Sequence, residues 1–150
     1  MVIDTNVLPK MFNRKNTDYC KYNKFREWIY GPKGHIKYGG SKYLMELKRL
    51  VKIVRLINEF GRSGKAKCLP RTEVDAEQIR IEGLCNQKRF NDAHILAIAI
   101  VGRCKCICSE DKSAHQFFKD RDNLYPNAGL PRFNVIHSST TGLDVSHLYE

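Results

Sequence analysis

The sequence predicts an α/β fold in which helices cover both faces of a mostly parallel sheet. Short apolar runs of the kind that form buried strands alternate along the chain with segments whose apolar residues recur at helical spacing. The 150 residues suit a single domain. No internal repeat, low-complexity linker or shift in composition marks a second domain, so we expect one domain over residues 1–137 and a tail over 138–150.

The first strand candidate is the apolar start of MVIDTNVL at residues 1–8, which runs directly into Asp4. A short β-branched run that ends in a carboxylate is typical of a buried strand that delivers an acid to the carboxyl edge of a sheet. Open α/β sheets bind their ligands at that edge. Pro9 and the charged segment 13–16 then break the pattern.

The next segment is expected to be a helix that is capped by Thr17 or Asp18. Four apolar residues at helical spacing form its stripe: Tyr22, Phe25, Trp28 and Ile29. Residues 31–34 end this helix, and residues 35–38 are a short strand candidate.

The longest predicted helix begins at a cap on Ser41 and runs to about Phe60. One face is mainly apolar and carries Leu44, Leu47, Leu50, Val51, Val54, Ile57 and Asn58. The opposite face is basic, and we expect it to bind nucleic acid through Lys42, Lys48, Arg49, Lys52 and Arg55. A small strand candidate follows at residues 66–69.

The second half of the chain continues the alternation. Thr72 or Asp75 opens a helix that carries the apolar residues Ile79, Ile81, Leu84 and Cys85. Asn91 caps the next helix, which is apolar over 93–101 except for His94 and is therefore expected to be buried. The remaining elements expected are a strand at 103–108, a helix at 114–119 and a strand at 133–136.

The charge balance indicates a polyanionic partner. The chain has 26 Lys and Arg residues against 16 Asp and Glu residues, a net charge of +10. Nucleic acid is the leading candidate, and a basic surface that serves only solubility is the alternative. The longest apolar run, residues 95–101, is too short to span a membrane, and no signal peptide is visible. We therefore expect a cytoplasmic protein without a membrane partner.

The six cysteines are expected to be reduced and to pack as small apolar residues. Three of them alternate as CKCIC over residues 104–108, which places them on one face of a strand. This spacing differs from the two-residue gap of a zinc knuckle. A zinc-stabilised structural protein is therefore a weak alternative.

Four acids stand at the edges of apolar elements: Asp4, Glu46, Asp92 and Asp111. Three of them have an ordinary explanation, because Asp92 and Asp111 can cap helices and Glu46 can be a surface charge. Asp4 is the hardest to explain in this way, because it follows a buried strand candidate and belongs to no helix. As a set they predict one site. Carboxylates that converge repel one another, and a divalent cation such as Mg²⁺ or Mn²⁺ relieves that repulsion. Such a site in a basic protein indicates phosphodiester hydrolysis.

Four segments carry a resemblance to a known family. They are IDTNVL at 3–8, SKYLMEL at 41–47, FNDAHILAIAI at 90–100 and CICSEDKSAHQFF at 106–118. With these motifs the chain resembles the PIN-domain proteins and is most similar to the small ribonucleases of the VapC toxin type. It departs from the family pattern at Glu110, an additional acid beside Asp111, and at His94, which we assign to helix packing.

The resemblance implies a PIN-like three-layer α/β/α sandwich with a central parallel sheet of about five strands. It also implies an endoribonuclease that depends on Mg²⁺ or Mn²⁺. By the resemblance Asp4, Asp92 and Asp111 hold the metal, and Glu46 binds metal or orients the attacking water. The same resemblance gives Asn6 and Ser109 as residues that support these acids or contact the substrate phosphate. Glu110, the additional acid, is a further candidate that shares the role of Asp111 or takes it over.

The partners expected are RNA, a second copy of the chain and, if the protein is a toxin, a cognate antitoxin. The dimer is expected to use an apolar surface on the first helix, formed by Tyr22, Phe25 and Trp28. The alternative function is a non-catalytic PIN-like module that binds RNA or protein through the basic helix face.

Overall fold

The computed structural model describes residues 1–84, 90–119 and 132–139. Its strands form two parallel sheets. β1 (Val2–Ile3), β4 (Cys106–Cys108) and β5 (Asn134–Ile136) make a three-stranded sheet in the order β1-β4-β5. β2 (Ile36–Gly39) and β3 (Ala66–Leu69) make a two-stranded sheet. The predicted parallel orientation is confirmed, whereas the single sheet of about five strands is present as two sheets.

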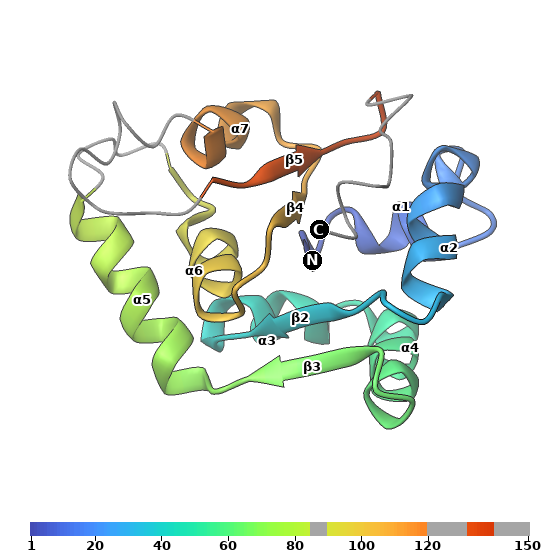
Figure 1. The fold of residues 1–150 in the computed structure, drawn as a ribbon, viewed down its shortest axis with the longest axis horizontal. Coiled ribbons are helices and arrows are strands. Elements are labelled where there is room, and N and C mark those ends of the chain that lie inside the picture. The colour runs from blue at the N-terminus through green and yellow to red at the C-terminus, as the bar shows by residue number, and fades with distance from the viewer. Residues whose placement is uncertain (85–89, 120–131, 140–150) are drawn as a thin grey trace.

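Met1 links the two sheets. Its nitrogen donates to the carbonyl oxygen of His35 at 2.8 Å, and its carbonyl oxygen accepts from the Lys37 N–H at 2.9 Å. These two bonds lie on either side of Ile36, which is the pattern of a parallel ladder. In Figure 1 the strands accordingly succeed one another from β3 at the bottom to β5 at the top, with the chain start between β2 and β4.

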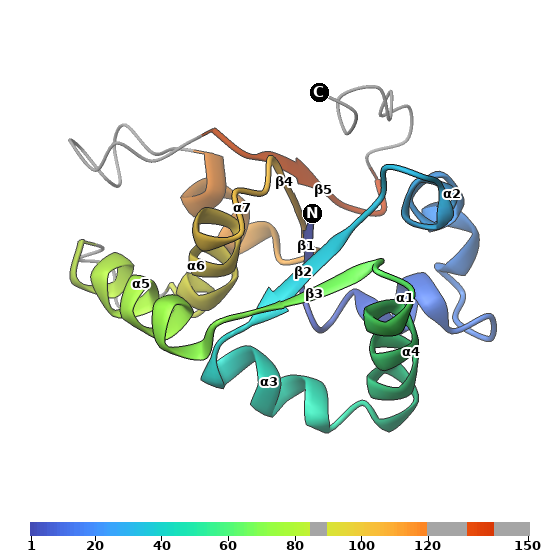
Figure 2. The ribbon, with the colours of Figure 1, turned by 60° about the horizontal axis from the view of Figure 1, so that its bottom comes forward.

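The helices occupy the connections between the strands. They are α1 (Leu8–Phe12), α2 (Asn23–Tyr30), α3 (Ser41–Lys48), α4 (Val51–Arg62), α5 (Arg71–Leu84), α6 (Ala93–Val101) and α7 (Lys112–Lys119), with a 3₁₀ turn η1 (Tyr19–Tyr22) before α2. Figures 1 and 2 show α5, α6 and α7 on one side of the strands and α1, α2 and α4 on the other. Within the described residues, no helix has both the length and the apolar character needed to cross a membrane.

The predicted burial of α6 is confirmed. Residues 93–99 are all buried, and the helix contacts β1, β2, β4 and α5. A helix that is apolar on every side is stable only where protein surrounds it, and α6 fills this position at the centre of the fold.

The prediction of one helix over residues 41–60 is wrong. The chain leaves the helical conformation at Leu50, where φ is −105° and ψ is 67°, and α4 begins at the next residue. The break changes which side of the second helix faces the core. Ile53, Ile57 and Phe60 are buried, whereas Val51 is 61% exposed.

The start of α3 also differs from the prediction, because Ser41 does not cap it. Ser41 is the first helical residue, and its N–H and Oγ donate to the Asp75 carboxylate at 2.7 and 2.6 Å. Asp75, the fifth residue of α5, therefore accepts from a backbone N–H in the first turn of α3 that has no partner within its own helix. This bond joins the two helices.

Two further corrections concern residues 8–30. Pro9 does not break the chain but lies in the first turn of α1, where the missing N–H has no helical partner to lose. The helix expected after Thr17 begins as the 3₁₀ turn η1 and becomes α2 at Asn23. The predicted apolar stripe is buried at Tyr22, Phe25, Trp28 and Ile29. Because these side chains lie in the core, they do not form the exposed surface on which the expected dimer rested.

The remaining apolar predictions have mixed outcomes. Cys104, Cys106 and Cys108 are buried, as expected for core packing, whereas Cys20 and Cys68 are exposed. On α5, Ile81 is buried, whereas Ile79 and Leu84 are 69% and 39% exposed. Cys85 and residues 140–150 of the expected tail lie outside the described residues.

Gly40 provides a test of the packing between α3 and α5. Its φ is +78°, and a Cβ atom there would lie 2.5 Å from Val74 Cγ1. We expect Gly40→Ala to lower the free energy of unfolding by about 2–4 kcal/mol, through backbone strain and the steric contact together. Urea denaturation measures this loss.

Gly64→Ala is the matched control. Gly64 has a similar φ of +74°, but nothing lies within 4 Å of an added Cβ. Only the backbone strain remains, so the loss is expected to be about 1 kcal/mol. Equal losses in the two variants would contradict the packing described for Gly40.

Candidate active site

Asp4 follows the last residue of β1 and is held there by backbone and side-chain bonds. Its N–H donates to the Cys108 carbonyl oxygen at 2.8 Å, which extends the ladder between β1 and β4. Its Oδ1 accepts from the Asn6 N–H at 3.2 Å, and its Oδ2 accepts from Ser109 Oγ at 3.0 Å. The residue is only 4% exposed. The fold thus fixes a buried carboxylate at the carboxyl end of the sheet.

Glu46 reaches the same edge from α3. The hydroxyl of Tyr43, one turn earlier on α3, donates to the Ile3 carbonyl oxygen at 2.7 Å and ties the helix to β1. Thr5 Oγ1 donates to Glu46 Oε2 at 2.7 Å. The Glu46 carboxylate therefore lies beside the residue that follows Asp4.

Asp92 occupies the N-cap position of α6, but its side chain makes no capping hydrogen bond. The ordinary explanation of Asp92 as a helix cap therefore lacks the bond that it requires. Burial raises the pKa of its carboxyl group to about 6, and the charges of Asp4 and Asp111 add to this effect. Lys42 acts in the opposite direction and lowers the pKa of Asp92.

Asp111 caps α7. Its Oδ1 accepts from the N–H and Oγ of Ser113, at 2.8 and 2.6 Å. These bonds hold the pKa of the Asp111 carboxyl group below its usual value. These bonds support the explanation of Asp111 as a helix cap. Both end on Oδ1, so capping does not engage the second carboxylate oxygen, Oδ2. The side chain is exposed, unlike that of Asp4.

The four predicted acids lie within electrostatic reach of one another. Burial raises the pKa of Asp4, and the charges of Glu46 and Asp111 raise it further. The charges of all three other acids, Asp4, Asp111 and Glu46, raise the pKa of Asp92. Within the described residues no Lys or Arg forms an ion pair with Asp4, Asp92 or Asp111. The negative charge is therefore concentrated, and Lys42 offsets only part of it at Asp92.

A divalent cation fits this site by donor chemistry and charge. Carboxylate oxygens are the ligands that Mg²⁺ and Mn²⁺ prefer, and Mg²⁺ often keeps several waters and uses only one or two protein carboxylates. Among residues 1–84, 90–119 and 132–139, no three His, Cys, Asp or Glu side chains are close enough together to hold a metal ion. The fit thus depends on one or two carboxylates with water, rather than on a complete cage of protein ligands.

Glu110 forms its hydrogen bonds with residues outside the acidic cluster. Its carboxylate accepts hydrogen bonds from the Tyr22 hydroxyl and from the N–H and Oγ of Ser138. Although burial acts to raise the pKa of Glu110, these bonds hold it below the usual value. Both oxygens are thereby engaged in joining β4 to η1 and to the residues after β5.

The other two predicted supporting residues lie at Asp4. Ser109 is buried and donates to Asp4, as described above. Asn6 donates to Asp4 through its backbone N–H, and Asn6 itself is exposed to solvent. Each residue therefore orients the Asp4 carboxylate in this structure.

His94, which the sequence analysis assigned to helix packing, is buried in α6 as expected and also lies close to Glu46. It is 2% exposed, and its Nε2 lies 3.4 Å from Glu46 Oε2 without the alignment of a hydrogen bond. Burial lowers the pKa of His94 to about 4, so the ring is neutral at pH 7. The sequence analysis did not identify Thr5, which donates to Glu46, or Tyr43, which donates to Ile3. The only sequence feature that could have indicated Thr5 is its position between Asp4 and Asn6.

The predicted basic surface is divided by the break between α3 and α4. Lys42 is half-buried and donates to the Asn91 carbonyl oxygen beside Asp92. Lys48, Arg49, Lys52 and Arg55 are exposed. A pocket of about 540 Å³ between α1 and α4 is lined by Arg14, Arg49 and Lys52 together with apolar residues of both helices.

Comparisons with protein-family models, curated proteins and solved structures find no match for this chain. The resemblance to PIN domains therefore rests on the sequence motifs and stays a prediction.

Asp92→Asn tests the electrostatic description of the site. A carboxyl group whose pKa is higher in the folded than in the unfolded state destabilises the fold once the pH exceeds the unfolded value, here 3.8. We expect the variant to raise the free energy of unfolding by about 1–2 kcal/mol at pH 7.5, with allowance for solvent screening. The gain should disappear below about pH 4. Urea denaturation at both pH values measures it.

Asp111→Asn is the matched comparison, because its expected effect on the free energy of unfolding is opposite to that of Asp92→Asn. The pKa of Asp111 is lowered, so its charge stabilises the fold above the unfolded value of 3.8 and this contribution is lost as the pH falls. The substitution should therefore lower the stability at pH 7.5. A loss of stability in both variants at pH 7.5 would contradict the repulsion inferred for Asp92.

Proposed function

We propose that this chain is a PIN-like ribonuclease that hydrolyses RNA phosphodiester bonds with Mg²⁺ or Mn²⁺. The observation that carries the proposal is the acidic cluster of Asp4, Glu46, Asp92 and Asp111, with which no described Lys or Arg forms an ion pair. A protein that only binds RNA gains nothing from carboxylates that repel phosphate, whereas a metal-dependent nuclease requires them. The net charge of +10 supports the proposal, because basic residues outside the cluster attract the RNA backbone.

The proposed fold is the three-layer PIN-like sandwich with five strands. The ladder bonds of Met1 on either side of Ile36 support it, since they align the two observed sheets in the order β3-β2-β1-β4-β5. All the observed strand pairs are parallel. This order brings the carboxyl ends of β1 and β4, and with them Asp4 and Ser109, to one edge.

In the proposed mechanism one or two of the carboxylates of Asp4, Asp92 and Asp111, together with water, would hold the cation. When bound, it supplies Lewis-acid activation of water and neutralises charge on the phosphate. Glu46 orients the attacking water or accepts its proton, and the Thr5 hydroxyl keeps Oε2 in position for this task. Ser109 and the Asn6 N–H orient the Asp4 carboxylate.

The exposed cations on the helices bind the substrate backbone in this proposal. Arg49 and Lys52 line the pocket between α1 and α4. Asp4 and α1 are separated by only three residues, so this pocket can receive RNA that extends from the cluster. Lys48 contributes from the end of α3.

A cleavage assay on a panel of RNAs tests the function. We expect cleavage with Mg²⁺ or Mn²⁺ that stops when a chelator is added. Asp4→Asn should lower the rate by at least about 100-fold, because it removes a charge from the centre of the cation site. Single-stranded DNA of the same sequence shows whether the activity is restricted to RNA.

Asp18→Asn is the control for loss of one negative charge. Asp18 is paired with Lys21 at 2.7 Å on the surface, and we expect its variant to retain full activity. Full activity of Asp4→Asn would refute the site assignment. RNA binding without cleavage, unaffected by either metal, would instead identify a binding module.

A further inference from the structure

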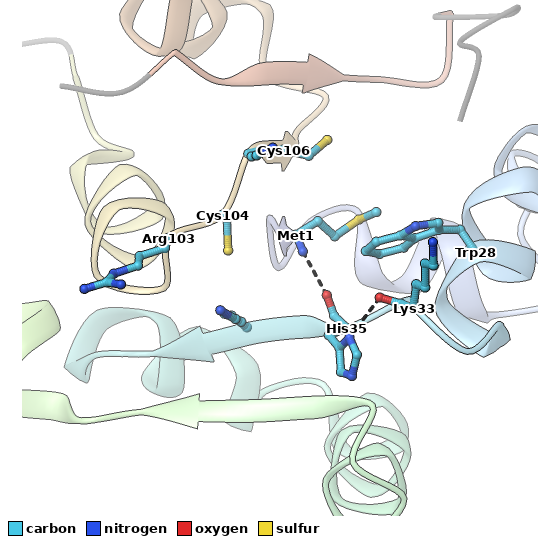
Figure 3. Close-up of a pocket in the computed structure, with 9 residues that line it drawn as sticks. Met1, Trp28, Lys33, His35, Arg103, Cys104 and Cys106 are labelled. Atoms are coloured by element: carbon cyan, nitrogen blue, oxygen red, sulfur yellow. Dashed lines mark hydrogen bonds between the residues drawn. The ribbon is translucent and has the colours of Figure 1, made fainter. Parts of the chain in front are cut away.

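Three buried side-chain nitrogens have no hydrogen-bond partner in the part of the chain that the structure describes: Trp28 Nε1 and both ring nitrogens of His94. Trp28 lines a pocket of about 230 Å³ together with Met1 and His35, which directly precede β1 and β2 (Figure 3). This pocket lies at the amino ends of the strands, and none of the four acids lines it. His94, in contrast, is the second residue of α6 and follows Asp92 by two positions. Its unpartnered nitrogens therefore lie at the acidic cluster.

His94 is a buried polar group next to one carboxylate oxygen. Its side chain is 3% exposed, and its ring centroid lies 6.5 Å from that of Tyr43. The distance from His94 Nε2 to Glu46 Oε2 is 3.4 Å, slightly beyond the ~3.2 Å at which N–H···O bonds usually end. A buried donor without an acceptor is unfavourable, so a small movement that completes this hydrogen bond is favoured.

The His94 ring is neutral at pH 7. Burial, assisted by the charge of Lys42, lowers the pKa of His94 to about 4, although Glu46 and the backbone of Asn91 act in the opposite direction. A neutral imidazole carries a single N–H, and the hydrogen bonds around the ring decide which nitrogen bears it. The nearby Glu46 carboxylate favours the proton on Nε2, from which it can be donated to Oε2.

One oxygen of Glu46 thereby has two donors from different parts of the chain. Thr5 donates to Oε2 at 2.7 Å and is 5% exposed, and His94 approaches the same oxygen from α6. Neither contact uses Oε1, and the Glu46 side chain is 29% exposed. The terminal torsion of a glutamate is otherwise loosely defined. Two buried groups on Oε2 restrict it and fix the direction of Oε1.

We propose that His94 is a positioning residue for Glu46: its Nε2–H donates to Oε2, so that Oε1 is directed at the attacking water. This inference rests on the proposed nuclease function and deepens it by giving the two oxygens separate tasks. Packing alone would be served better by an apolar side chain, which has no nitrogen to leave without a partner. The other residues of α6 are all apolar.

His94→Leu and His94→Gln separate positioning from packing. Leucine fills the space without a donor, so we expect kcat for RNA cleavage to fall by about 10- to 100-fold with KM unchanged. The melting temperature of His94→Leu should stay the same or rise, because an apolar side chain replaces an unpartnered ring. Glutamine offers an N–H donor near the position of Nε2 and should restore most of the lost kcat.

The same substitution in a Glu46→Ala chain tests whether His94 acts through Glu46. If it does, His94→Leu lowers kcat no further in that chain, because the group that it positions is absent. His35→Leu is the matched control. His35 is exposed and lies at the amino ends of the strands (Figure 3), so we expect its variant to keep the native kcat.

NMR of the histidine ring nitrogens tests the contact in the metal-free protein, without reference to catalysis. The signals of His94 are assigned by their loss in His94→Gln. We expect its ring proton on Nε2 at pH 7, and we expect the Nε2 resonance to shift in Glu46→Ala.

Three results would overturn the inference. The first is a ring proton on Nδ1, which would assign the His94 donor to another acceptor than Glu46. The second is equal kcat in His94→Leu and His94→Gln, and the third is a full further loss of kcat from His94→Leu in the Glu46→Ala chain. Absence of cleavage by the native chain with either metal would instead refute the proposed function, and with it the role of His94 toward water.

Discussion

The hydrogen bond from the Asp4 N–H to the Cys108 carbonyl oxygen fixes a carboxylate at the carboxyl end of β1, where burial opposes its ionisation. Other parts of the fold are arranged around this group. Ser109 and Asn6 donate to its two oxygens, and the Tyr43 bond to Ile3 holds α3 against the same strand. A fold that needed only stability would not place further acids here, since each added carboxylate raises the free energy of the others.

The two edges of the sheets have opposite electrostatic character. The carboxyl edge gathers acids, among which Asp92 has a pKa raised to about 6 and no capping bond to offset its burial. The amino edge gathers Lys and Arg residues, including Arg103 in a left-handed conformation. The carboxyl edge therefore carries local destabilisation that the buried α6 and the parallel ladders must outweigh. Raised carboxyl pKa values of this kind are typical of functional sites.

Much of this arrangement follows from periodicity. The burial of α6 and the strand at 66–69 were predicted, because an entirely apolar helix and a short run bounded by Gly64 and Pro70 allow few alternatives. The four acids were also predicted as a group from their places at element ends. Neither glycine nor proline marks the break at Leu50, so the pattern alone did not separate α3 from α4.

Contacts between distant residues explain the other failures. Glu110 accepts from Tyr22, 88 positions earlier, and no local pattern shows such a bond. The packing of His94 inside α6 was predicted correctly, but its distance of 3.4 Å from Glu46 on another helix was not. The most direct test of the acidic site is the melting temperature during titration with Mg²⁺ or Mn²⁺, in the native chain and in an Asp4→Asn, Asp92→Asn double variant. Binding to the folded state predicts a rise of several degrees at saturating metal in the native chain and none in the variant. An equal rise in both, or no rise in the native chain, would contradict a cation site at these carboxylates.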